Sequence, residues 1–167
     1  MEDGLPVAIE KRDLLYIVLS RLEASLLAGD ALSRRALQDL VFVAQSWGIP
    51  LDYEFSFSLK GPHSNALLPD ILHLQQRRGS YQRRTRTMAL TTKAERQMAL
   101  LKDFIDELKE DRRRLHLVSS VMFLGTRLGL DKHGIVAHFQ RYSPDYFPFE
   151  IAEVVDLVNE RTPVRIP

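Results

Sequence analysis

Cysteine is absent from this chain of 167 residues, which excludes a disulfide scaffold, a thiolate metal site and a cysteine nucleophile. No apolar run approaches the roughly 18 residues that a membrane-spanning helix requires, so we expect no membrane contact. The N-terminal residues include Glu2, Asp3 and Glu10, and they lack the basic, apolar and small-residue layout of a secretion signal. Together these absences predict a cytoplasmic protein.

Sequence signatures of catalysis are also missing. The chain has no Gly-x-Ser-x-Gly, no Ser-x-x-Lys and no phosphate-binding loop. Ser119 and Ser120 fall on an apolar segment with no adjacent base in this interpretation. We therefore predict no enzymatic activity, no cofactor and no metal. None of the histidines forms a zinc-protease pair, and we expect each to be structural or exposed: His63, His73, His116, His133 and His138.

Acidic residues are absent from one long stretch of the chain, between Asp70 and Glu95. The net charge of the whole chain is only +1, so the basic residues in this stretch form a local patch rather than a general coat. Arginine binds phosphate through a planar fork and stays charged at any working pH, which makes the patch a candidate nucleic-acid contact. Its members are Arg77, Arg78, Arg83, Arg84, Arg86 and Lys93.

Hydrophobic spacing predicts a mainly α protein (α+β) with a small antiparallel β element. Alternating apolar and polar residues over 53–59 predict a half-buried strand, and Gly61 to Ser64 a turn. Pro69 either kinks a helix capped by Ser64 or stands at the first position of a helix that begins near Leu68. A first helix is predicted over 12–27, and a second from a cap at Ser33 to Gly48. A third, the Pro69 helix, ends at Arg78, and a fourth begins at a capping box formed by Thr92 and Glu95. Three more are predicted over 117–128, 131–141 and 151–158.

The order of elements around the basic patch is typical of a winged-helix domain. A helix ends at Arg78, the polar run 79–91 reads as a hairpin wing, and a long helix follows. On the pattern Ile71-Leu72-x-Leu74, Gly79-x-Tyr81 and Leu90-Thr91-x-Lys93-Ala94-Glu95, residues 71–108 resemble the PadR and MarR types of winged-helix regulator. We predict a winged-helix-like domain over 12–110 and a helical C-terminal extension over 111–160 packed on it.

A second resemblance covers residues 12–160. It rests on the segment 35–45, the predicted strand with the Gly61-Pro62-His63-Ser64 turn and the helical segment 67–72, Leu90-Thr91, and the segments 117–124 and 143–158. In this order they resemble the YwgA-like family and, more distantly, the Panacea antitoxin domain. The chain has Arg35 and Asp39 where that family favours lysine, and His63 where tyrosine is usual. The resemblance implies a compact, mainly helical cytosolic protein with no known enzymatic chemistry and, for the Panacea relatives, toxin neutralisation by protein contact.

Two smaller groups have alternative interpretations. Lys60, Ser64 and Asn65 would hold a phosphate at a helix start, although a structural turn with Ser64 as helix cap is the favoured alternative. An aromatic group near the C-terminus is expected to seal a small core under the last helix, with a partner surface as the alternative. This group consists of Tyr142, Tyr146, Phe147 and Phe149.

The leading functional prediction is a non-catalytic regulator that contacts DNA through the basic helix end and the wing. The alternative is an antitoxin-like interaction module, in which the same arginines meet an acidic protein partner. An apolar seam on the long helix predicts a homodimer, which would present two wings and favour DNA. A monomer with the Pro69 helix packed over the wing would favour a protein partner. The seam consists of Ala94, Met98, Leu101, Ile105 and Leu108.

Overall fold

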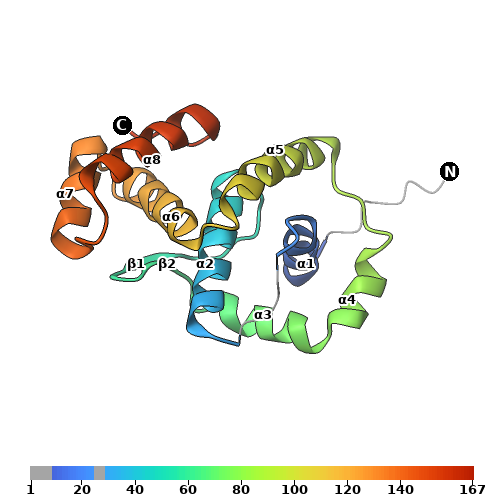
Figure 1. The fold of residues 1–167 in the computed structure, drawn as a ribbon. Coiled ribbons are helices and arrows are strands. Elements are labelled where there is room, and N and C mark those ends of the chain that lie inside the picture. Colours follow the sequence, from blue (N-terminus) through green and yellow to red (C-terminus); the bar gives the residue numbers. More distant parts are fainter. Residues whose placement is uncertain (1–8, 25–28) are drawn as a thin grey trace.

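The computed structural model describes residues 9–24 and 29–167, which are mainly helical with one two-stranded antiparallel sheet. This confirms the predicted mainly α fold with a small antiparallel β element. Figure 1 shows α1 beside α3, α4 and α5 in one half of the molecule, with α6, α7 and α8 in the other. No helix in the described ranges has the length and apolarity needed to cross a membrane. The elements are α1 (Lys11–Arg21), α2 (Ala31–Ser46), β1 (Ser56–Ser58), β2 (Gly61–His63), α3 (Leu67–Gln76), α4 (Arg78–Thr85), α5 (Thr92–Leu108), α6 (Arg112–Arg127), α7 (Lys132–Tyr142) and α8 (Pro148–Arg161).

Helix α1 is enclosed by its neighbours. Leu15, Val18 and Leu19 are fully buried, and the helix contacts α3, α4 and α5. The helix was predicted to continue to residue 27, but residues 22–24 are not helical. Helix α1 ends at Arg21, and Glu23 adopts a left-handed φ of 54° that interrupts a helix. The rest of that extension, residues 25–28, lies outside the described residues.

Helices α2 and α6 form the most extensive helix pair of the core. Phe42 on α2 and Phe123 on α6 meet with their ring centroids 5.5 Å apart. One hydrophobic cluster takes in buried residues from α1 through α8, so the predicted extension over 111–160 shares its core with the rest of the chain. The two parts are therefore joined by apolar burial as well as by the chain.

Side chains cap the start of several helices. Asp30 caps α2 through a 2.7 Å bond from the Ser33 amide to Oδ1, so the prediction of Ser33 as the cap is wrong. The predicted cap at Asp131 is confirmed by a bond from the Gly134 amide. The capping box expected at Thr92 is wrong, because Thr91 is the residue that caps α5.

The β element is a short hairpin packed on α6. Its register pairs Ser56 with His63, Phe57 with Pro62 and Ser58 with Gly61. The strand predicted over 53–59 therefore holds only for 56–58, and the turn predicted at 61–64 is wrong because 61–63 form the return strand. Gly61 has a φ of 87°, and a Cβ there would lie 2.5 Å from Cε1 of His116. Glycine at this position lets the hairpin close against α6.

The first part of the segment predicted as a wing, 79–91, is a helix, and the rest of it is a turn and an irregular connection to α5. Residues 78–85 form α4, which follows α3 at the junction residue Arg77. The buried ring of Tyr81 stacks on Tyr16 of α1 at 5.8 Å, and its hydroxyl bonds to Nδ1 of His73 at 2.8 Å. These tertiary contacts outweigh the helix-breaking tendency of Gly79, on which the prediction depended.

Pro69 lies in the first turn of α3, which begins at Leu67. An amide in the first turn has no partner within its own helix, so proline removes no helical hydrogen bond there. The alternative of a helix starting near Leu68 is the closer of the two predictions, and the kink is not required.

The apolar seam of α5 is buried within the chain. Met98, Leu101, Ile105 and Leu108 are at most 2% exposed, and Phe104 stacks on Trp47 at 5.6 Å. The prediction of a homodimer through this seam is wrong, because the side chains meant for a second copy already fill the core. Ala94 at the start of the seam is half-buried.

Neighbouring leucines on α5 provide a direct test of this burial. Leu101→Ala should lower the free energy of unfolding by about 2–5 kcal/mol, because it empties a fully buried site. Leu100→Ala, at a side chain 56% exposed, should change it by less than about 0.5 kcal/mol. Urea unfolding measures both. Equal effects, or a change of molecular mass on Leu101→Ala, would argue for the seam as an interface.

Candidate nucleic-acid interface

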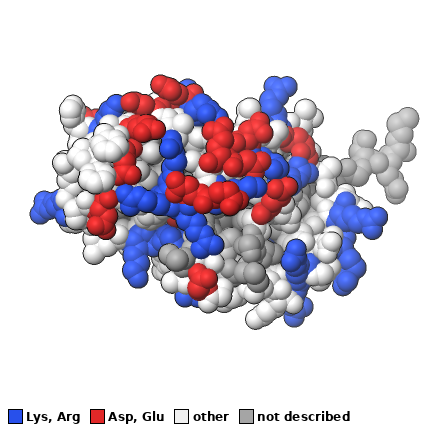
Figure 2. Space-filling model, in the orientation of Figure 1, with Lys and Arg blue, Asp and Glu red and all other residues white. Residues whose placement is uncertain are grey.

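Helix α4 has one face against the chain and one face in solvent. At about 100° per residue, Arg78, Arg83 and Arg86 fall within about 140° of the helix circumference. All three are exposed, while Tyr81 and Arg84 lie on the opposite side and contact α1. Figure 2 shows Lys and Arg over the α4 edge without acidic side chains among them, whereas both signs mix over α5 and α8.

Arg84 fastens α4 to α1. Its Nε donates to Oδ1 and Oδ2 of Asp13 at 2.9 and 3.1 Å, and Nη2 also donates to Oδ1. The Asp13 side chain is only 3% exposed. The hydrogen bond to this carboxylate raises the pKa of the Arg84 guanidinium. The prediction of Arg84 as a nucleic-acid contact is therefore corrected, because its charge is already paired inside the fold.

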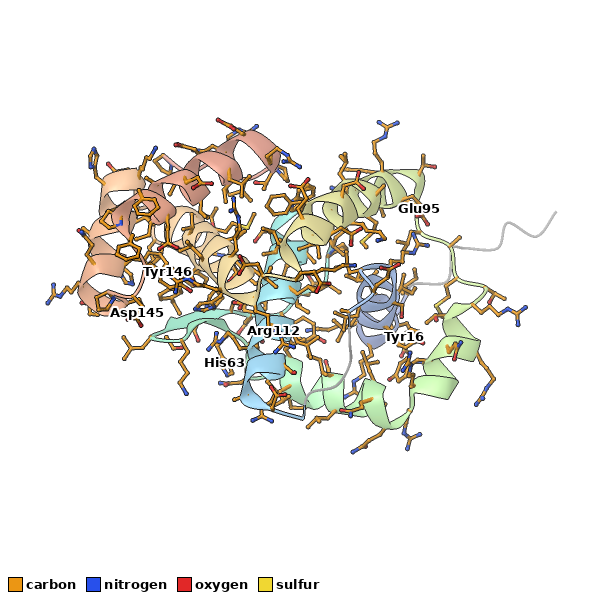
Figure 3. The ribbon with its side chains drawn as sticks, in the orientation of Figure 1. Tyr16, His63, Glu95, Arg112, Asp145 and Tyr146 are labelled. Carbon is orange, nitrogen blue, oxygen red and sulfur yellow. The ribbon has the colours of Figure 1, made fainter. Side chains whose placement is uncertain are left out.

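Aromatic stacking supports the same junction. The Arg84 guanidinium carbon lies 4.6 Å from the centroid of the Tyr81 ring. Tyr16 projects from α1 toward α4 and stacks on the same ring (Figure 3). The inward face of α4 thus carries the ion pair and the Tyr81 ring, which lies against both Arg84 and Tyr16. These contacts determine which face of α4 points outward.

A second set of hydrogen bonds joins α1 to α3, the two helices that α4 contacts. Asp70, in the first turn of α3, accepts hydrogen bonds from Nε of Arg12 and from the Tyr53 hydroxyl, each at 2.7 Å. Burial and then this hydrogen bond raise the pKa of Tyr53, which keeps its hydroxyl protonated. The bond to Asp70 also raises the pKa of Arg12. Helices α1 and α3 are therefore joined independently of α4.

The side chains of the other predicted cations form no ion pair or hydrogen bond with any residue in the described ranges. These cations are Arg77, Arg78, Arg83, Arg86 and Lys93. Arg77 sits at the α3–α4 junction, and Lys93 is in the first turn of α5. Eight helical residues span about 12 Å at 1.5 Å each, roughly the length over which one DNA strand carries three to four phosphates. The fold thus brings three arginines to one face of α4, and Arg77 immediately precedes that helix.

The turn predicted to bind an anion has other partners. The Ser64 amide donates to Oε1 of Gln38 at 2.9 Å, so it is not free for a phosphate. Oδ1 of Asn65 bonds to Nε2 of His63 at 2.9 Å, and Lys60 lies in the tight turn of the hairpin. Ser64 is not the helix cap either, because α3 begins after Ala66 without a side-chain cap.

The C-terminal aromatic group does not seal a core. Tyr142, Phe147 and Phe149 are 47%, 61% and 68% exposed, so that prediction is wrong for three of the four residues. Phe147 and Phe149 stack on each other at 5.7 Å. Tyr146 alone packs inward, where the guanidinium of Arg113 lies 4.1 Å from its ring centroid. Burial of Tyr146 raises the pKa of its hydroxyl.

Sequence reasoning missed a polar cluster on α6. Ser119 and Ser120 do have a neighbouring base, His116, whose Nδ1 lies 3.0 Å from Oδ2 of Asp39. Ser119 donates its hydroxyl to Oδ1 of the same carboxylate at 2.6 Å. Helical spacing alone could have placed His116 beside the serines. The distant Asp39 has no such signal in the sequence.

Comparison with known proteins adds no relative: no family model, curated protein or solved structure matches this chain. The resemblances to the YwgA-like, Panacea, PadR and MarR families therefore stay predictions. No three potential metal ligands converge in the part of the chain that the structure describes. Function must accordingly be inferred from the geometry of the chain itself.

The Arg84–Asp13 pair predicts an asymmetry between two substitutions. Arg84→Ala should lower the melting temperature by several degrees more than Asp13→Ala, because it leaves a buried carboxylate without a cation. Asp13→Ala leaves a guanidinium that is 46% exposed and can be hydrated. Thermal unfolding followed by circular dichroism measures the difference. Equal melting temperatures for the two variants would contradict the structural role given to this pair.

Proposed function

We propose that the chain is a non-catalytic, cytoplasmic regulatory protein that binds nucleic acid through the outward face of α4. The observation that carries this proposal is the set of unpaired cations gathered around α4. Arg78, Arg83 and Arg86 share one exposed helix face, and no acidic residue occurs between Asp70 and Glu95. A patch of one sign on a nearly neutral protein attracts a polyanion at that place alone.

The contact we propose is to the phosphate backbone. Each guanidinium offers a planar fork to phosphate oxygens, and each phosphate neutralised releases condensed counterions. The face carries three arginines and Gln82, so it supplies position and affinity more than sequence readout. The Arg84–Asp13 pair holds α4 in place, so the outward arginines extend from a fixed helix.

An acidic protein partner, as in an antitoxin-like module, is the second candidate. Burial of the α5 seam favours it, because a dimer through that seam would have presented two copies of the basic face. The same arginines would then pair with carboxylates of the partner.

A charge-matched pair of variants tests the first candidate. Binding to a labelled 20-base-pair duplex is measured by fluorescence anisotropy at about 50 and about 200 mM salt. Changing Arg78, Arg83 and Arg86 to Ala should reduce affinity at least about tenfold and lower the salt slope by about 3, roughly one for each phosphate that is no longer neutralised. The control changes Arg112, Arg127 and Arg141 to Ala. All three are exposed and outside α4, so this variant should bind duplex with the affinity of the natural chain.

The outcomes separate the two candidates. Equal losses in both triple variants would mean that net charge, and not the α4 face, drives binding. No binding by the natural chain at micromolar concentration in low salt would overturn the nucleic-acid proposal. A polyglutamate peptide that then binds the natural chain, but not the α4 variant, would support the acidic-partner candidate.

A further inference from the structure

A cavity of about 410 Å³ lies between the hairpin and helices α6 and α7, a size in the ordinary range for small ligands. The hairpin packs on α6 and reaches toward α7 (Figure 1). Much of the wall is aromatic: Phe57 comes from β1, His138 and Tyr142 come from α7, and His116 comes from α6. Flat rings around a few polar groups are the usual composition of a small-molecule site.

His116 presents a hydrogen-bond acceptor to this cavity. Its Nδ1 lies 3.0 Å from Oδ2 of Asp39, and a carboxylate only accepts hydrogen bonds, so Nδ1 carries the ring proton. Asp39 is 1% exposed and also accepts the Ser119 hydroxyl at 2.6 Å, which holds the carboxylate and thereby the imidazole in place. The second ring nitrogen, Nε2, is left with a lone pair.

The Nε2 atom of His116 is accessible to a ligand. It has no hydrogen-bond partner among the described residues, and it is not one of the polar atoms that they enclose. The His116 side chain is 22% exposed, and it lines the cavity. A molecule in the cavity can therefore donate a hydrogen bond to Nε2.

The cavity lacks a partner for a charged ligand. No Asp, Glu, Lys or Arg lines it in the part of the chain that the structure describes. Burial lowers the pKa of His138, so this ring is neutral at pH 7. The Arg141 guanidinium carbon lies 5.3 Å from the ring centroid of Tyr142, which disfavours a second cation at this wall. A neutral ligand therefore fits better than a carboxylate or an ammonium ion.

The aromatic walls favour a ligand with a flat ring. Phe57 and His138 meet edge to face with their ring centroids 5.6 Å apart, and those of His138 and Tyr142 lie 4.8 Å apart. Phe123 supports Phe57 from the core, with 5.1 Å between the ring centroids. A ring placed among these side chains covers apolar surface that is otherwise in contact with water.

We propose that this cavity binds a neutral aromatic molecule with one hydrogen-bond donor, of the phenol class. The ring lies among Phe57, His138 and Tyr142, and the hydroxyl donates to Nε2 of His116. Asp39 holds the proton on Nδ1 and so leaves Nε2 as the acceptor. This inference does not depend on the nucleic-acid proposal, because no residue of α4 lines the cavity.

A pair of probes isolates the proposed hydrogen bond. The rings of 4-fluorophenol and 4-fluoroanisole are the same, but the methyl ether has no donor. Fluorine NMR titration of the full chain at pH 7, where a phenol is neutral, gives the affinity for each probe. We expect 4-fluorophenol to bind with a dissociation constant of about 1 mM, and about three- to tenfold more tightly than 4-fluoroanisole, the effect of one hydrogen bond between neutral groups.

Three variants locate the contact. His116→Asn removes Nε2 but keeps a side-chain amide that can donate to Asp39, and it should bring the two affinities to a ratio of about 1. His133→Asn is the matched control, because it changes an exposed histidine of α7 outside the cavity and should leave the ratio as in the natural chain. Tyr142→Ala removes a half-exposed wall residue and should weaken binding of both probes by a similar factor.

Several results would each overturn the proposal. They are equal affinities of the natural chain for the two probes, no binding of 4-fluorophenol at about 10 mM, and an unchanged ratio in a folded His116→Asn variant. Tighter binding of 4-fluorobenzoate than of 4-fluorophenol would indicate a cationic site and would also contradict it. If His116→Asn does not fold, the natural chain and Tyr142→Ala still decide, because neither comparison changes His116.

Discussion

The buried carboxylate of Asp13 governs the basic end of this molecule. A carboxylate enclosed within a fold needs a cation, and Arg84 is the residue that supplies it from α4. This ion pair, with Tyr81 stacked on Tyr16, determines which side of α4 faces the chain. The direction of Arg78, Arg83 and Arg86 follows, because the helix period leaves them on the other side.

The second carboxylate of this kind, Asp39, organises the opposite end. It orients His116 and binds Ser119, while Gly61 allows the hairpin to approach the same helix. In both places a helix near the N-terminus contributes a buried carboxylate, and a helix further along the chain contributes the basic side chain that pairs with it. Figure 1 shows the two regions apart, with α4 at one end of the molecule and α7 at the other.

Much of the fold could be predicted, because apolar periodicity and capping residues are local signals. The helix from Asp131 and the buried stripe of α5 are examples. The prediction of a wing was wrong for a physical reason. Gly79 is a local signal for the end of a helix, whereas the Arg84–Asp13 pair, which holds α4 against α1, joins residues 71 positions apart. Local patterns carry no information about such a partner.

The candidate sites divide in the same way. The acid-free stretch marks where the basic residues lie along the chain, but it could not separate paired Arg84 from unpaired Arg83 beside it. The pair of Asp39 and His116, 77 positions apart, had no local signal. The α5 seam was recognised as apolar, yet its pattern is the same whether a second copy or the chain's own core covers it.

Hydrogen–deuterium exchange with and without a 20-base-pair duplex tests the central claim most directly, because it reports both the helix and the surface used. The account predicts protected amides within α4 in the free chain and added protection on duplex binding confined to α4, the α3–α4 junction and the first turn of α5. Rapid exchange throughout 78–85 would contradict the helix. Added protection at the hairpin or α8, with none at α4, would contradict the proposed interface.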